Sequence, residues 1–435
     1  MMRVPRIVST SLVVACVMCA TPVPAQETGN TSTCGFEAVV SDSSYPSRAI
    51  AFASRLAEFG PRQAASTRES SARRMVVEEL EAIGLDVAIE VFDYETFLFE
   101  TSRIQLGDSP VSPVILGLNP FSQELIFSGE AIIVTDPSKA SDEIAGRIVV
   151  TNHPLMQLMI AEFEPSVVIC VEEADLESFE AKDSRTVSLE VTGRSVVARS
   201  ANVVARFGPR QTDKPEILVT SHIDAYQNSP GANDNGTGLG LMIELARAFS
   251  ADPRKTEASI AFVAFGAEEQ GAIGSRAYLQ RHVSELGQIR AVVNLDTLGG
   301  ALGPVIATKP SEDGASPDGP GIYIPTELRG RAWEGPAGNW RIIHPEIIPT
   351  AFTSYYPEWL HEIVTKSATG LGIEVVHLDL ISDHRSFARA GVPAISIQSK
   401  EHQIHSEDDT ADALVSETIE AGSKLAARIL CELAL

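Results

Sequence analysis

The second half of the chain alternates between short apolar runs and stretches with helical periodicity. The apolar runs occupy residues 217–220, 259–265, 291–295 and 394–397. The helical stretches, in which apolar residues recur every three or four positions, occupy residues 239–249, 276–286 and 414–433. Continuous apolar runs of this length are typical of parallel strands that are buried on both faces. Their alternation with helices predicts a three-layer α/β/α domain with a mostly parallel central sheet.

The segment before residue 97 predicts one helix and one strand. Residues 66–84 have apolar side chains at helical spacing, with Ser66 as a candidate N-cap and Gly84 as a stop signal. Residues 87–92 then alternate between apolar and polar side chains, which is typical of a strand.

Residues 97–199 have a different pattern, because helical periodicity fades and short β-like runs recur between turn residues. These runs occupy residues 131–135, 147–151, 167–171, 186–191 and 195–198. We therefore expect residues 97–199 to form a β-rich domain, inserted into an α/β domain that residues 26–96 and 200–435 build. Residues 302–350 are rich in Gly and Pro and predict a long loop.

Composition narrows the class of protein. The chain has 435 residues, of which 44% are hydrophobic and 21% charged, and this is typical of a globular protein with a large core. Its formal net charge of -24 argues against binding to nucleic acid, because such binding requires a basic patch.

The first 25 residues predict an export signal. Arg3 and Arg6 precede an apolar stretch at residues 7–20, and small residues before Gln26 offer a cleavage site. We therefore predict a secreted or periplasmic protein with no integral membrane segment after signal removal. The alternative is a lipid anchor at Cys16, because residues 13–16 resemble a lipobox.

Three cysteines remain after removal of the signal, so at most one disulfide can form within the chain. Cys34 and Cys431 lie near the two ends and are candidates to pair. Cys170 lies in an apolar run and is expected to be a buried free thiol.

Side chains that bind metals follow three of the apolar runs. They are His222 and Asp224 after the first run, Glu268 and Glu269 after the second, and Asp296 after the third. Because the carboxyl ends of parallel strands meet at one edge of a sheet, we expect these side chains to lie close together. Asp234, in a Gly- and Asn-rich loop before a helix, and His405 complete the set.

Two histidines and five carboxylates suit a pair of divalent cations that share one bridging carboxylate. Two cations about 3.5–4 Å apart lower the pKa of a bridging water and polarise the carbonyl of a peptide bond. A further carboxylate must then move the proton of the water to the leaving amine. Taken singly, each residue could have a structural role instead of a catalytic or metal-binding one. Asp234 could cap the helix that follows it, and Glu268 and Glu269 could form a charge pair at a helix N-terminus.

The whole set resembles peptidase family M28, the co-catalytic zinc peptidases that include secreted bacterial aminopeptidases. The resemblance implies that His222 and Asp296 bind one Zn²⁺, that Glu269 and His405 bind the other, and that Asp234 bridges both. It further implies that Asp224 accepts the other ring N–H of His222, and that Glu268 is the general base. Co²⁺ or Mn²⁺ also fits such ligands.

The resemblance extends to two further segments. The region 97–199 resembles the protease-associated domain that many members of the family carry. Residues 382–387 resemble a family segment near the substrate pocket, although Ser386 stands where the family often has proline.

The implied activity is hydrolysis of N-terminal residues from peptide substrates. A carboxypeptidase or dipeptidase of the same family is an alternative, with Arg385 or Arg389 to bind the substrate carboxylate. Glutaminyl cyclisation, which similar folds perform with one zinc, and a binding protein with an inactive site are others. The complete ligand set favours the two-metal peptidase.

Overall fold

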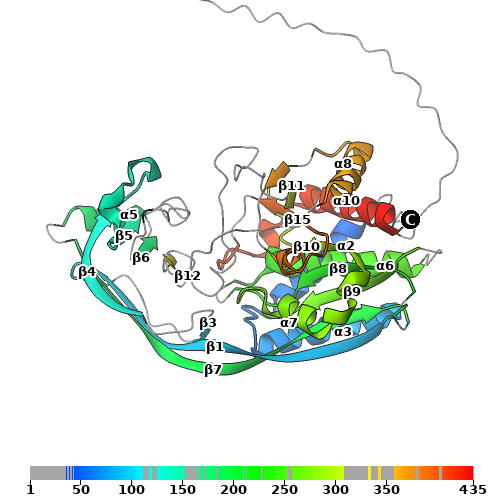
Figure 1. Cartoon of the computed structure of the whole chain (residues 1–435), viewed down its shortest axis with the longest axis horizontal. Helices are drawn as coiled ribbons and strands as arrows, with labels where there is room; N and C mark the ends of the chain where they lie inside the picture. Colours follow the sequence, from blue (N-terminus) through cyan, green and yellow to red (C-terminus); the bar gives the residue numbers. More distant parts are fainter. Residues whose placement is uncertain are drawn as a thin grey trace, which may run out of the picture. The chain divides into compact units, whose positions relative to one another are not determined.

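The structure is a computed structural model of the whole chain, and its central feature is one large mixed sheet (Figure 1). It describes residues 36, 39, 42, 44–110, 117–119, 125–151, 163, 167–170, 173–182, 185–208, 210–211, 213–226, 229–251, 257–307, 332–334, 341–343, 357–374, 376–378, 382–400 and 404–434. The predicted export signal at residues 1–25, the alternative anchor Cys16 and the candidate disulfide partner Cys34 lie outside these residues.

Four parallel strands form the middle of the sheet. Their order is β9 (Ser259–Phe265), β8 (Glu216–His222), β10 (Ile289–Leu295) and β15 (Ala394–Lys400). On one side, β9 pairs antiparallel with β7 (Thr186–Arg206). On the other side, β15 pairs antiparallel with β11 (Leu302–Ala307), which pairs parallel with β14 (Val376–Leu378). These pairings confirm the mostly parallel sheet that the apolar runs predict.

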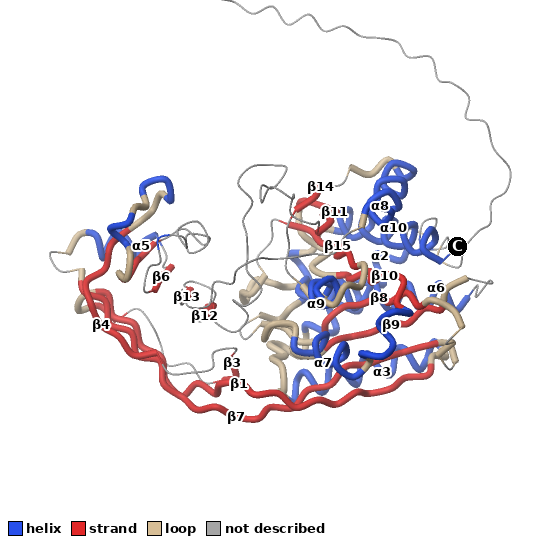
Figure 2. Tube along the Cα trace, in the orientation of Figure 1, coloured by secondary structure: helices blue, strands red, loops and turns tan. Residues whose placement is uncertain are grey.

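Side chains of the central strands alternate between two separate hydrophobic cores. Ile217 and Val219 of β8 face one core, whereas Leu218 faces the other. The first core contains residues of α2 (Ser44–Ala57), α3 (Thr67–Ile83), α6 (Gly238–Ala251), α8 (Glu358–Leu371) and α10 (Ser416–Ala434). The second contains Tyr278 of α7 (Ile273–Arg281) and Phe387 of α9 (His384–Arg389) (Figure 2). Helices thus cover both faces, which confirms the three-layer α/β/α fold.

A long antiparallel pair of strands, β1 (Asp86–Leu106) and β7, continues from the central sheet into the region 97–199. Within this region β7 pairs with β4 (Leu125–Ile133), which is followed in the sheet by β5 (Ile148–Thr151) and β6 (Val167–Cys170). The remaining elements there are α5 (Glu173–Glu180) and two short strands beside β1, β2 (Ser109–Pro110) and β3 (Gly117–Asn119). The five predicted runs all fall at these strands, and the predicted boundaries at 97 and 199 lie inside β1 and β7.

Several predicted elements differ in detail from the structure. The helix expected at 276–286 ends at Arg281, and a 3-10 turn (Val283–Gln288) follows it. The predicted helix at 66–84 is α3, which Ser66 caps by accepting the N–H of Glu69, and which Gly84 ends at a φ of 96°. Within 302–350, the described parts are β11 and two short paired strands, β12 (Ala332–Glu334) and β13 (Arg341–Ile343), rather than loop.

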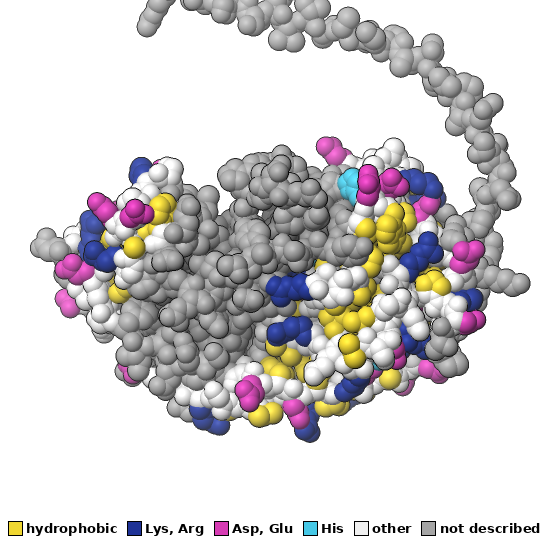
Figure 3. Space-filling model, in the orientation of Figure 1, with side chains coloured by type: hydrophobic (Ala, Val, Ile, Leu, Met, Phe, Trp, Pro, Cys, Tyr) yellow, Lys and Arg dark blue, Asp and Glu magenta, His cyan; other side chains and the backbone are white. Residues whose placement is uncertain are grey.

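Cys431 in α10 takes part in a disulfide, as expected for one of the terminal cysteines. Among the described residues, no helix is both long and apolar enough to cross a membrane. On the face drawn in Figure 3, acidic and basic side chains lie interspersed among the described residues.

Candidate metal centre

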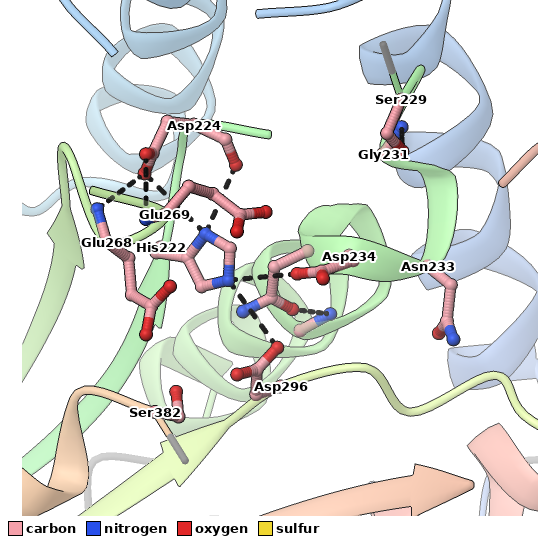
Figure 4. A network of polar contacts seen from close by, with 12 residues as sticks. His222, Asp224, Ser229, Gly231, Asn233, Asp234, Glu268, Glu269, Asp296 and Ser382 are labelled. Atoms are coloured by element: carbon pink, nitrogen blue, oxygen red, sulfur yellow. Dashed lines mark hydrogen bonds and ion pairs between the residues drawn. The ribbon is translucent and has the colours of Figure 1, made fainter. Parts of the chain in front are cut away.

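The predicted ligands come together at the carboxyl edge of the central strands. His222 is the last residue of β8, Asp296 directly follows β10, and Glu268 and Glu269 lie three and four residues beyond the end of β9. Asp234 lies in the irregular turn Ala232–Thr237, which leads into α6, and His405 lies beyond β15. The parallel register of β9, β8 and β10 brings their ends level, so the three loops meet at one edge (Figure 4).

Asp234 is shared between two groups of candidate ligands. Its Oδ1 lies 3.1 Å from Nε2 of His222, which is also 3.5 Å from Oδ1 of Asp296. Its Oδ2 lies 3.1 Å from Nε2 of His405, which is also 3.2 Å from Oε2 of Glu269. Within each group, the ligand atoms all lie within 4.8 Å of one another. The geometry therefore offers two cation positions on either side of one carboxylate.

The chemistry of these groups fits divalent cations. Oε1 of Glu269 is buried without any hydrogen bond from the described residues, and the same holds for Oδ1 of Asp296. Buried carboxylate oxygens without a partner are costly, and a cation removes that cost. The group around His222 is almost fully buried, whereas the His405 side chain is 25% exposed, so the centre opens to solvent on the His405 side.

Protonation in the metal-free protein follows from burial and from the neighbouring charges. Burial, together with the charge of Asp234, raises the pKa of Glu269 to about 7. Burial alone would raise the pKa of Asp234, but hydrogen bonds from His222 and His405 hold it well below its usual range. Burial alone would lower the pKa of His222, but Asp296 and the adjacent carboxylates raise it well above its usual value. The cluster thus stores protons that bound metal ions would release.

Asp224 binds backbone groups more closely than it binds His222. Its two carboxylate oxygens accept the N–H groups of Glu268 (2.9 Å) and Glu269 (3.1 Å). Nδ1 of His222 lies 3.1 Å from the backbone carbonyl oxygen of Asp224 but 3.6 Å from its carboxylate. The carbonyl therefore takes the ring contact that the resemblance implies for the carboxylate, and the carboxylate fixes the Glu268–Glu269 turn instead.

Glu268 stands apart from both groups of ligands. Ala267 before it has a left-handed backbone (φ 56°), and a tight turn follows in which the N–H of Gly271 binds the carbonyl of Glu268. This irregular turn directs the Glu268 and Glu269 side chains to different sides, as Figure 4 shows. Burial raises the pKa of Glu268 well above its usual range. A buried carboxyl group that lies outside both groups of candidate ligand atoms is a candidate for proton transfer.

The segment 382–387 was expected near the substrate pocket, whereas further residues at the site were not expected from sequence. Asn294 donates a hydrogen bond to Ser382 (2.8 Å), which brings the segment 382–387 beside Asp296 (Figure 4). In that segment Asp383 is fully buried, and burial raises its pKa to about 7. The ring of Tyr226 stacks on His405 with centroids 4.5 Å apart. Arg62 and Asp409 also contact the ligand loops. They lie far from the motifs in sequence or carry no pattern of their own.

The metal-free protein should lose stability as the pH rises from about 5 to 8. Glu69, Glu269 and Asp383 keep protons in the folded protein, with pKa values raised by burial to about 7, at pH values where the unfolded chain has lost them. The raised pKa of His222 acts in the same direction, and the lowered pKa of Asp234 matters only below this window. We expect the Tm without metal to be about 5 °C lower at pH 8 than at pH 5. A flat or rising profile in calorimetry with a chelator would contradict this.

The fold and the site together define an α/β protein with two groups of candidate metal ligands at the carboxyl edge of its sheet. Residues 202–316 match the profile of peptidase family M28. This match confirms the resemblance that the motifs carry. It does not extend to the region 97–199, whose likeness to a protease-associated domain stays a prediction.

Two curated relatives and one solved structure illustrate the similarity. Aminopeptidase YwaD of Bacillus subtilis (strain 168) is 37% identical over 135 residues, which are 30% of this chain and 28% of that protein. A probable zinc metalloprotease of Pyrenophora teres f. teres is 26% identical over 242 residues, which are 51% of this chain and 48% of that protein. The chain thus matches less than half the length of each. An aminopeptidase from Aneurinibacillus sp. strain AM-1 shares the fold, with a TM-score of 0.60 and 19% identity over 92% of this chain and 96% of that one.

Proposed function

We propose that this protein is a di-zinc aminopeptidase that hydrolyses N-terminal residues from peptides. The observation that carries the proposal is the position of Asp234, 3.1 Å from the ring nitrogens of both His222 and His405. One carboxylate between two histidines is the arrangement that a pair of co-catalytic cations requires. The aminopeptidase and zinc protease names of the curated relatives support the same assignment.

His222 and Asp296 would hold one Zn²⁺, Glu269 and His405 the other, and Asp234 both. Imidazole and carboxylate ligands suit zinc, and they also accept Co²⁺ or Mn²⁺. When bound, the two ions supply Lewis acidity, which makes water more acidic and a peptide carbonyl more electrophilic.

The chain's own residues supply the proton transfer and the positioning. Glu268 accepts the proton of the attacking water and returns it to the leaving amine, since it directly precedes the candidate ligand Glu269 and belongs to neither group of ligand atoms. Asp224 holds the backbone of Glu268 and Glu269, so the base and the ligand keep a constant separation. The carbonyl of Asp224 accepts Nδ1–H of His222 and leaves Nε2 free to bind metal.

The acidic surroundings support binding of an α-ammonium group rather than a carboxylate. Glu268, Glu269, Asp296 and Asp383 all line this edge of the sheet. Of the two arginines that a carboxypeptidase would need, Arg385 is fully buried and Arg389 lies exposed at the end of α9. Both observations favour an aminopeptidase over the carboxypeptidase alternative.

The test is hydrolysis of a dipeptide panel by the zinc-loaded protein, with each peptide in free and N-acetylated form. We expect cleavage of the free-amine peptides and at least about a 100-fold lower kcat/KM for the acetylated ones, because loss of a buried charge contact costs several kcal/mol. Equal cleavage of both forms would favour the carboxypeptidase. Absence of cleavage with metal bound would overturn the peptidase assignment and favour glutaminyl cyclisation or an inactive site.

A further inference from the structure

The loop that carries Asp234 is bound through its N–H groups by one buried acid. We call residues 229–235 the bridging loop. The carboxylate of Asp409 accepts the N–H of Asn233 (2.7 Å) and the N–H of Asp234 (3.1 Å), and the hydroxyl of Ser229 donates to it at 3.2 Å. The carbonyl of Asp409 accepts a further N–H, that of Ala232 (3.1 Å). Asp409 lies four residues after His405, so it ties the two loops that supply one metal position.

The same loop is bound through its carbonyl groups by one buried base. Arg62, between α2 and α3, is fully buried. Its Nη2 donates to the carbonyl of Gly231 (2.8 Å), and its Nη1 donates to the carbonyl of Pro230. Its Nε donates to the carbonyl of Ile223 (2.7 Å), between His222 and Asp224. One guanidinium therefore joins the loop of His222 to the bridging loop.

The contact between Arg62 and the loop leaves no space for a side chain at Gly231. Gly231 has a φ of 65°, which favours glycine. A Cβ at this position would lie 2.7 Å from Nη1 of Arg62 and 2.5 Å from the carbonyl oxygen of Asp234. The guanidinium and the bridging loop thus pack directly against each other.

Arg62 also carries a charge that the described ion pairs do not neutralise. Each of its three nitrogens donates to a carbonyl group, and no carboxylate of the described residues forms an ion pair with it. A buried arginine is costly unless nearby negative charge offsets it. Asp409, Asp224, Asp234 and Glu269 are the acids that act on it electrostatically.

We propose that Arg62 and Asp409 are positioning residues that hold the bridging loop in its metal-binding shape before metal arrives. Arg62 also serves as the fixed cation that keeps the mutually repelling carboxylates together. The inference rests on the proposed metal centre. It assigns to both residues an effect on metal affinity, not on the chemical step.

The test compares metal affinity in Arg62→Lys and Asp409→Asn with that of the wild type. Lysine keeps the charge but cannot reproduce the planar fork that reaches three carbonyls. Asparagine at position 409 keeps one carbonyl oxygen that can accept a backbone N–H, but its NH₂ group cannot accept the other. We expect Zn²⁺ to bind about 10–100-fold more weakly in each variant, in competition with a chromophoric chelator. At saturating Zn²⁺, kcat should return to within about threefold of the wild-type value.

Arg48→Lys and Asp412→Asn are the matched controls. Arg48 lies partly exposed on α2 and pairs with Glu244, and Asp412 is exposed in the turn after Asp409. Neither control should change the Zn²⁺ affinity. Circular dichroism verifies folding. If Arg62→Lys fails to fold, the Zn²⁺ affinity of the folded Asp409→Asn variant still tests the proposal.

Unchanged Zn²⁺ affinity in a folded Asp409→Asn variant, or a fall in kcat that saturating Zn²⁺ does not reverse, would overturn the inference. Weaker Zn²⁺ binding in the variants supports it even where the wild type cleaves no peptide. That last result would count against the proposed aminopeptidase activity alone.

Discussion

Replacing Glu268 by glutamine should lower kcat for peptide hydrolysis by a factor of about 10²–10⁴ and leave the metal content unchanged. Glu268 belongs to neither group of ligand atoms, so its loss removes a proton acceptor and no metal ligand. Its backbone N–H, which binds Asp224, is retained, so the turn should keep its shape. Glutamine has the size of glutamate and can still donate and accept hydrogen bonds, but it cannot take a proton at neutral pH.

The measurement pairs steady-state kinetics with metal analysis of the same preparation. Glu420→Gln is the matched control, because Glu420 lies on α10, away from both groups of candidate ligands, in a partly exposed pair with Lys424. A Glu268→Gln protein that loses metal would show that Glu268 is a ligand. A Glu268→Gln protein with near-normal kcat would remove it from the proposed proton transfer.

Replacing Asp234 by asparagine should empty both metal positions at once. Each oxygen of the Asp234 carboxylate faces a different histidine, so an amide leaves one position without its bridging oxygen and both without the shared negative charge. We expect the metal content to fall from about two ions per chain to well below one after dialysis, and activity to fall below detection.

Asp296→Asn and Glu269→Gln provide the comparison, because each belongs to only one group. Each should weaken one position selectively and leave the other ion measurable by plasma emission. A loss of only one ion in Asp234→Asn, equal to the loss in Asp296→Asn, would contradict a shared carboxylate.

The central strands and the site at their ends follow from short-range features of the sequence. Apolar runs such as 259–265 are buried on both faces, so their signal is continuous and easily distinguished from the polar loops that follow. Because parallel strands end at the same edge, the meeting of His222, Glu269 and Asp296 needs no knowledge of long-range contacts.

The parts that sequence did not predict depend on contacts between distant segments. In the sequence, nothing distinguishes Arg62 from an ordinary surface arginine. In the structure, it donates hydrogen bonds to the carbonyl groups of Ile223 and Gly231. The helix α2 was not predicted, although its buried residues recur at helical spacing and its Phe52 and Leu56 lie in the main core. The early end of α7 follows from packing too: the His282 ring lies against Tyr278 and between Glu90 and Glu285, where the chain leaves the helix.

The paired strands β1 and β7 have a consequence for how this chain could have acquired its middle region. Asp93 of β1 lies directly opposite Arg199 of β7, and the two side chains form a bidentate ion pair. Everything between them leaves and re-enters the fold at neighbouring points. A short hairpin turn joining these two positions would therefore close the chain without altering the central strands of the α/β domain. Gain or loss of the region would be a single local event in evolution, and the same junction is the natural place to exchange it for another module.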